Sequence, residues 1–145
     1  MKITKPWVIG IDPGTNTGVA VWDTEAKEFV RLELMDFWCT YDFVTGNYNP
    51  DDVLLVIEDA RLNKATFRHK GEGAYQDRLS RNVGNIQKEC GLLIAGFERL
   101  SYDVRKIKPT PKDHKWDAAT FTRYTGIKKG YNEHIRDAAR LVWGM

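Results

Sequence analysis

The sequence of 145 residues contains only two cysteines, Cys39 and Cys90, and neither has the CxxC or Cys/His spacing of a zinc site. No apolar run approaches the roughly 20 residues that cross a bilayer. Residues 1–6 lack the apolar segment of a signal peptide. These absences predict a cytoplasmic protein without a membrane partner, whose two cysteines are small core residues in a reducing compartment.

The sequence also has little net charge, but its charges are unevenly distributed. The formal net charge is +2, yet residues 23–60 hold ten acids and two bases, whereas residues 61–145 hold 18 bases and nine acids. This separation favours an acidic metal-binding region beside a surface that binds a polyanion. Solvated helix faces would produce the same counts, so charge alone does not decide between the two interpretations.

The apolar pattern predicts one α/β domain over residues 1–145, without repeats or linkers. Short β-rich segments predict three consecutive antiparallel strands over 7–11, 18–22 and 29–34. The continuous apolar run 53–57 is typical of a strand buried on both faces by helices. The remaining elements are expected to be helices over 36–44, 75–100, 112–122 and 132–143, the last with Asn132 as N-cap, and a strand over 102–107.

A carboxylate stands where the first strand gives way to a glycine turn, in the sequence IGIDPGTNTG of residues 9–18. Asp12 at this point can bind a divalent metal, or it can lie near a phosphate that the turn glycines allow close to the backbone. A third interpretation is that Asp12 only caps a turn. The stretch by itself does not choose among them.

Two further acidic positions are comparable to Asp12. Glu58 ends the buried strand, and Asp137 lies on the last helix, three residues after His134. If the first strand and the buried strand are neighbours, Asp12 and Glu58 meet at one edge of the sheet, and the helix places Asp137 across them. The three acids together predict a metal site, in which His134 is either a ligand or an ordinary surface histidine.

Three motifs carry a resemblance to a known family: IGIDPG at 9–14 with Gly18, VIE at 56–58, and NEHIRDAA at 132–139. In this order and spacing they resemble the RuvC-type Holliday junction resolvases of the ribonuclease H-like superfamily, especially the short phage and prophage versions. The resemblance covers nearly the whole chain. It implies a ribonuclease H-like α/β fold with a five-stranded mixed sheet flanked by helices, a homodimer, and a bacterial host cell if the chain is phage-encoded.

The resemblance also implies a function for each motif. The catalytic, metal-binding residues would be Asp12, Glu58, His134 and Asp137, which hold two Mg²⁺ or Mn²⁺ ions and no nucleotide cofactor. Family members carry either Asp or His at the position of His134, and Glu133 would then be a helix-start or supporting residue. The implied activity is metal-dependent, structure-selective hydrolysis of branched DNA, with the four-way junction as first substrate and flaps and forks as others.

Basic residues near these motifs are candidate DNA contacts. The loop after Glu58 carries Arg61, Lys64, Phe67, Arg68 and Lys70, in which Phe67 would stack on an unpaired base. Some relatives have an aromatic where this chain has Arg61, which counts against that role for Phe67. A second group comprises Lys106, Lys108, Lys112, His114 and Lys115. Of these, Lys108, Lys112 and Lys115 are candidate phosphate contacts, with a solvated helix end as the alternative.

Several alternatives remain open. Gly84 and Gly91 in the long helix predict a close approach by another backbone, either a second copy of the chain or the protein's own sheet. A YqgF-type nuclease that acts on structured RNA shares the first motif, and a catalytically silent junction-binding protein would also fit. An actin-like ATPase has a similar phosphate loop but needs two such domains, so we reject it.

Overall fold

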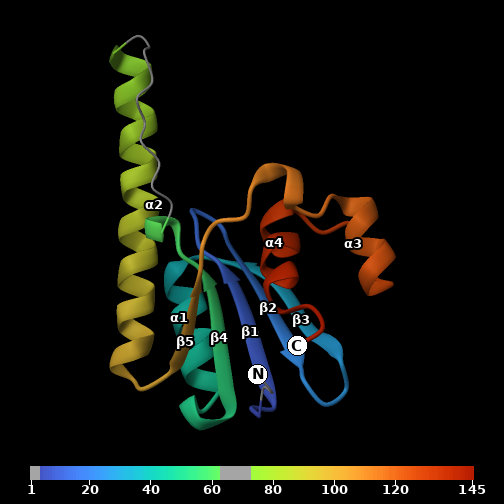
Figure 1. Ribbon diagram of the computed structural model, residues 1–145. Helices are drawn as coiled ribbons and strands as arrows, with labels where there is room; N and C mark the ends of the chain where they lie inside the picture. Colours follow the sequence, from blue (N-terminus) through green and yellow to red (C-terminus); the bar gives the residue numbers. More distant parts are fainter. Residues whose placement is uncertain (1–3, 63–72) are drawn as a thin grey trace.

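The computed structural model describes residues 4–62 and 73–145, and its centre is a five-stranded mixed sheet (Figure 1). The strands are β1 (Trp7–Asp12), β2 (Thr17–Asp23), β3 (Glu28–Met35), β4 (Val53–Glu58) and β5 (Asp103–Ile107). Their order in the sheet is β3-β2-β1-β4-β5; β1, β2 and β3 are antiparallel, and β4 runs parallel to both β1 and β5. The predictions of three consecutive antiparallel strands and of a mixed sheet are confirmed.

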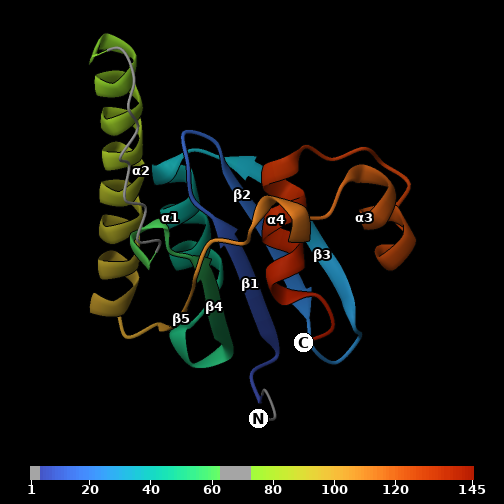
Figure 2. The same ribbon diagram turned by 45° about the horizontal axis from the view of Figure 1, so that its top comes forward.

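Helices cover both faces of this sheet, as the two views in Figures 1 and 2 show. The helices are α1 (Phe37–Asn47), α2 (Gly73–Arg99), α3 (Ala118–Thr125) and α4 (Glu133–Val142). The strand β4 is buried on both sides: Leu55 and Ile57 pack in the core beneath α1 and α2, whereas Leu54 and Val56 pack in the core beneath α4. The continuous apolar run therefore marks an interior strand, as the sequence predicted.

Capping residues begin the helices at defined positions. The carboxylate of Asp36 accepts a hydrogen bond from the Cys39 backbone N–H at 2.7 Å, and the Asn132 side chain accepts one from the Ile135 N–H at 3.1 Å. These bonds satisfy donors that have no partner inside the helix. Asn132 is the N-cap that the sequence predicted.

The predicted helix over 112–122 is wrong. The chain instead forms a single 3₁₀ turn over Lys112–His114, and α3 begins only after Asp117. The Asp117 side chain accepts a hydrogen bond from the Thr120 N–H at 2.7 Å, so it starts a new helix instead of continuing an old one. Gly126, at a φ of 74°, ends α3 in the left-handed conformation that glycine adopts readily.

The two cysteines differ in their surroundings. Cys90 is buried, but Cys39 is exposed, so the expectation of two core cysteines is wrong for Cys39. The reason is the orientation of α1, which buries Thr40 and Val44 and leaves Cys39 toward solvent. Among the described residues, no helix combines the length and the apolar character required to span a bilayer.

Two glycines allow α4 to lie directly on the sheet. Gly10 in β1 faces the backbone carbonyl of Ala138, and Gly18 in β2 faces that of His134; a Cβ at either position would overlap the carbonyl oxygen. Gly18 is therefore more than part of a tight turn. Because Gly18 pairs with Asp12 across β1 and β2, this contact brings the start of α4 beside Asp12.

Candidate functional site

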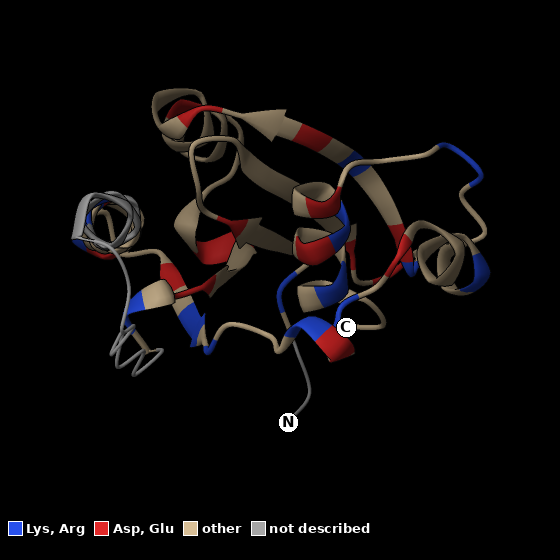
Figure 3. Cartoon of the chain, turned by 90° about the horizontal axis from the view of Figure 1, so that it is seen from above, with Lys and Arg blue, Asp and Glu red and all other residues tan. Residues whose placement is uncertain are grey.

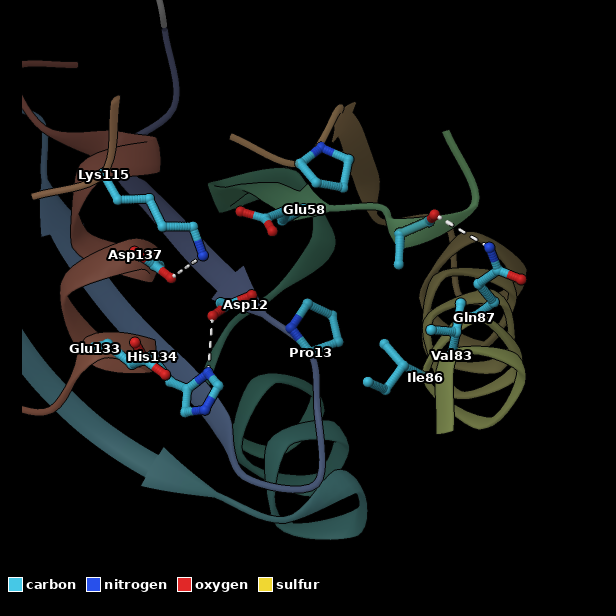
Figure 4. Close-up of a pocket in the computed structure, with 12 residues that line it drawn as sticks. Asp12, Pro13, Glu58, Val83, Ile86, Gln87, Lys115, Glu133, His134 and Asp137 are labelled. Carbon is cyan, nitrogen blue, oxygen red and sulfur yellow. Dashed lines mark hydrogen bonds and ion pairs between the residues drawn. The ribbon is translucent and has the colours of Figure 1, made fainter. Parts of the chain in front are cut away.

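The four residues of the predicted metal site line one cavity, which has a volume of about 280 Å³. Asp12 ends β1, and Glu58 ends the adjacent parallel strand β4, so both carboxylates emerge at the same edge of the sheet. The helix α4 crosses this edge and contributes His134 and Asp137 (Figure 4). The structure thus brings together the residues that the three sequence motifs had singled out.

Two cationic or hydrogen-bonding side chains lie against the carboxylates. The His134 Nδ1 is 3.2 Å from the Asp12 Oδ2, and the Lys115 ammonium donates to the Asp137 Oδ2 at 3.0 Å (Figure 4). Asp12 and Asp137 are 7% and 6% exposed, so these partners reduce the cost of placing two carboxylates away from water. Lys115 is consequently part of the cavity itself, closer to the acids than a lysine at a solvated helix end would be.

Burial makes two of the carboxylates hard to ionise. The pKa of Asp12 rises from 3.8 to about 6, chiefly because of burial, although the hydrogen bond with His134 opposes the change. The pKa of Glu58 rises from 4.5 to about 7, because of burial and then because of the neighbouring charge of Asp12. Burial alone would lower the pKa of Lys115, but the hydrogen bond with Asp137 and the nearby acids raise it.

These shifts predict that the metal-free protein loses stability as the pH rises through the site's titration. The unfolded chain releases the Glu58 proton near pH 4.5 and the folded chain only near pH 7, so the unfolded state gains relative stability across this interval. Unfolding by urea, at several pH values within this interval, should show a Glu58→Gln variant gaining stability over wild type toward its upper end. A constant difference between the two proteins would contradict the shift.

The donor set fits a hard divalent cation. In residues 4–62 and 73–145, no three His, Cys, Asp or Glu side chains lie close enough to form a ready metal-binding group. Oxygen ligands from Asp12, Glu58 and Asp137 nevertheless suit Mg²⁺ or Mn²⁺, and one imidazole is tolerable with Mn²⁺. Buried carboxylates that repel one another are also a site at which a bound cation would be stabilising. The two-ion site stays a prediction.

An ion pair with a buried carboxylate, which the sequence did not indicate, follows Glu58 directly. Asp59 is 1% exposed, and Arg61 donates to both of its carboxylate oxygens, from Nε at 2.9 Å and from a terminal nitrogen at 2.8 Å. Hydrogen bonding by Arg61 holds the pKa of Asp59 below its usual value. The guanidinium lies against Gly91 of α2. Arg61 therefore ties the end of β4 to α2, whereas its role as a DNA contact stays a prediction.

Arg61→Ala should lower the free energy of unfolding by about 1–3 kcal/mol, because it leaves the buried Asp59 carboxylate without its bidentate partner. The Arg61 side chain is 42% exposed, which keeps the effect below that of a fully buried pair. Urea unfolding measures the change, with Lys112→Ala as an exposed control. Adding Asp59→Ala should recover part of the loss, and equal stability of Arg61→Ala and wild type would contradict this account.

The other candidate DNA contacts divide into two groups. Lys64, Phe67, Arg68 and Lys70 lie outside the described residues. Lys108 and Lys112 are exposed and do not line the cavity. Seen from above, acidic positions on α4 and at the neighbouring strand ends lie among basic positions, and further acidic positions lie on the outer strand and helix (Figure 3). Basic positions close to the carboxylates could contact phosphates on either side of the cavity.

The glycines of α2 do not pack on the protein's own sheet. A Cβ at Gly84 would meet no described atom within 4 Å, and Gly91 faces the side chain of Arg61. Of the two interpretations that the sequence left open, packing of this helix on the sheet through its glycines is wrong. Contact of Gly84 with a second copy of the chain stays a prediction.

Sequence reasoning missed one whole side of the cavity. Val83, Ile86 and Gln87 of α2 line it on the side away from the carboxylates, and Pro13 and Pro109 line it as well. Val83 and Ile86 lie in the helix expected over 75–100, but helical spacing of apolar residues does not distinguish a core position from a cavity wall. The signal becomes visible only when the position of α2 relative to β4 is known.

Comparison with the known families and proteins gives no further guide to identity. No protein-family model matches the sequence. A search of curated proteins likewise finds no match. The α/β sheet flanked by helices is compatible with a ribonuclease H-like fold.

Proposed function

We propose that the chain is a metal-dependent, structure-selective endodeoxyribonuclease with a ribonuclease H-like fold, which cuts branched DNA as a homodimer. The observation that supports the proposal most strongly is the convergence of Asp12, Glu58 and Asp137 in one cavity, from two parallel strand ends and a helix. Three acids from separate parts of the chain are costly to hold together. Binding of divalent cations is the common function that offsets this cost.

In the proposed reaction, water adds to the phosphorus and the bond to the 3′ oxygen breaks, which leaves a 5′-phosphate and a 3′-hydroxyl. Asp12, Glu58, Asp137 and His134 would hold two Mg²⁺ or Mn²⁺ ions, which supply an activated water and stabilise the leaving oxygen. His134, 3.2 Å from Asp12, also orients that carboxylate. Lys115 lines the same cavity and is placed to contact a phosphate oxygen.

The substrate and the assembly rest on less direct support. The excess of bases over acids in residues 61–145 favours a nucleic-acid partner. None of the described residues comes within 4 Å of a Cβ at Gly84, which is compatible with a second copy of the chain at α2. A dimer would present two such cavities to the two strands of a four-way junction. The cytoplasm remains the expected location, that of a bacterial host cell if the chain is phage-encoded.

A substrate panel tests the proposal. Purified wild-type protein is incubated with a four-way junction, a flap, a replication fork, linear duplex DNA and structured RNA, each with Mg²⁺ and with Mn²⁺. The proposal expects strand cuts in branched DNA and none in linear duplex. Cleavage confined to RNA would favour the YqgF-type alternative, and intact branched DNA in both metals would refute the proposed activity.

A catalytically silent junction-binding protein is the second candidate. The observation in its favour is that Asp137 already has Lys115, and Asp12 already has His134, within hydrogen-bonding distance. Such a protein would bind a four-way junction equally well in EDTA and in Mg²⁺, and it would bind equally well after removal of Asp12.

A further inference from the structure

The candidate cavity has two chemically unlike sides. One side carries Asp12, Glu58 and Asp137, and the other is a wall formed by Val83, Ile86 and Gln87 of α2. In Figure 4 Val83 and Ile86 extend from α2 toward the cavity, with Pro13 between them and the carboxylates, and the Gln87 amide beside them faces Ala60. Metal ions and a phosphate are bound by charged and polar groups, so such a ligand would leave the apolar side chains of the wall uncovered.

The apolar part of this wall is not part of the protein core. Val83 and Ile86 are each partly exposed, and among the residues that the structure describes neither belongs to the two apolar clusters that pack on the faces of the sheet. Their side chains therefore border the cavity while Leu93 and Phe97, further along the same helix, are buried. When a ligand surface covers apolar groups at the edge of a polar cavity, the free energy of the complex falls, because apolar surface is removed from water.

The Gln87 amide completes the wall with groups that can recognise polar atoms. Its Nε2 donates to the Ala60 carbonyl across a long 3.5 Å contact. A hydrogen bond at that distance is weak and is readily exchanged for a better one. The amide offers one donor and one acceptor side by side, the pair with which glutamine recognises the edge of an adenine.

We propose that the wall of Val83, Ile86 and Gln87 receives the base of a nucleotide next to the scissile phosphate, and that Gln87 hydrogen-bonds to the edge of that base. The inference rests on the proposed nuclease function and extends it to sequence preference. In a duplex both faces of a base are covered by its stacked neighbours, so only an unstacked base can lie against Val83 and Ile86. The base must therefore leave the helix, which is easiest where a branch already disturbs stacking.

The first experiment maps cleavage positions on a four-way junction whose crossover can migrate over all four bases. Wild type should favour one base next to the cut, and Gln87→Ala should reduce this preference about five-fold or more, because it removes the hydrogen bonds to the base edge. The matched control is Asn85→Ala, which removes another amide from the exposed surface of α2 without touching the cavity. Its cleavage map should match that of wild type.

The second experiment measures coupling between the wall and the base. The nucleotide on each side of the cut is replaced, one at a time, by an abasic residue, and cleavage rates are measured for wild type and Ile86→Ala. One of the two replacements should slow wild type about ten-fold, because a base–side chain contact is lost, and should slow Ile86→Ala much less. For each protein, the rate on the abasic substrate is divided by its own rate on the intact substrate. A general loss of stability changes both rates alike and leaves this ratio unchanged.

The outcomes separate the two proposals. A wild-type protein that leaves every branched substrate intact refutes the proposed function, and this inference with it. A wild type that cuts without base preference, or an abasic replacement that slows wild type and Ile86→Ala by the same factor, overturns the inference alone. An altered cleavage map in Asn85→Ala would likewise overturn the role of Gln87.

Discussion

Asp12→Asn is expected to abolish DNA cleavage, with a fall in rate of about 1,000-fold or more. The carboxylate ends β1 at the centre of the cavity, and the amide that replaces it carries no charge to hold a divalent cation. Loss of roughly 4 kcal/mol of stabilisation of the transition state corresponds to this factor. The measurement is the single-turnover rate on a four-way junction at saturating Mn²⁺.

The same substitution should leave the fold intact and make the metal-free protein more stable near pH 8. Burial raises the pKa of Asp12 to about 6, so its ionised form costs stability at that pH, and asparagine removes the cost. Asp113→Asn is the control, since its side chain is 80% exposed and does not line the cavity. Retention of cleavage by Asp12→Asn, or loss of cleavage by Asp113→Asn, would contradict the assignment.

Gly18→Ala should lower the free energy of unfolding by about 3 kcal/mol, because the new Cβ would overlap the His134 carbonyl oxygen. The obstacle is the backbone of α4, which cannot move without disturbing the apolar contacts of Ala138 and Val142. Displacement of α4 would also carry His134 away from Asp12. Urea unfolding measures the stability, and the cleavage rate of the folded fraction measures the displacement.

Gly84→Ala is the matched control for this substitution and should change stability in the opposite direction. Gly84 lies within α2, and a Cβ there meets no described atom within 4 Å. In the monomeric chain, without a second copy at Gly84, alanine should therefore stabilise the helix by about 0.5–1 kcal/mol. If Gly18→Ala proved as stable as Gly84→Ala, the close approach of α4 to β2 would be wrong.

Local patterns were sufficient for most of the fold. Short β-rich runs and the buried run of β4 depend on neighbouring residues alone, and Asn132 is a capping residue by its own chemistry. The prediction of a helix over 112–122 failed because Asp117 caps a new helix that starts at Ala118. The spacing of apolar residues contains no information about such a cap. The prediction that Cys39 is a core residue failed because its burial depends on how α1 packs on the sheet.

The candidate site could be predicted in part for a related reason. Asp12 and Glu58 end adjacent parallel strands, so their meeting follows from topology once the strands are assigned. The pair between Lys115 and Asp137 and the pair between Arg61 and Asp59 depend on side-chain rotamers and on loop paths. The contribution of α2 depends on where a long helix docks, and spacing in the sequence does not encode that position.

The most direct test of the account is the rate of four-way junction cleavage by wild-type protein as a function of Mn²⁺ concentration, near pH 6 and near pH 8. The account expects no cleavage without metal, saturation as metal is added, and a higher metal requirement at the lower pH. That requirement arises because Asp12 and Glu58, with pKa values of about 6 and about 7, must lose protons to bind the ions. Cleavage that is independent of metal, or no cleavage at either pH, would contradict it.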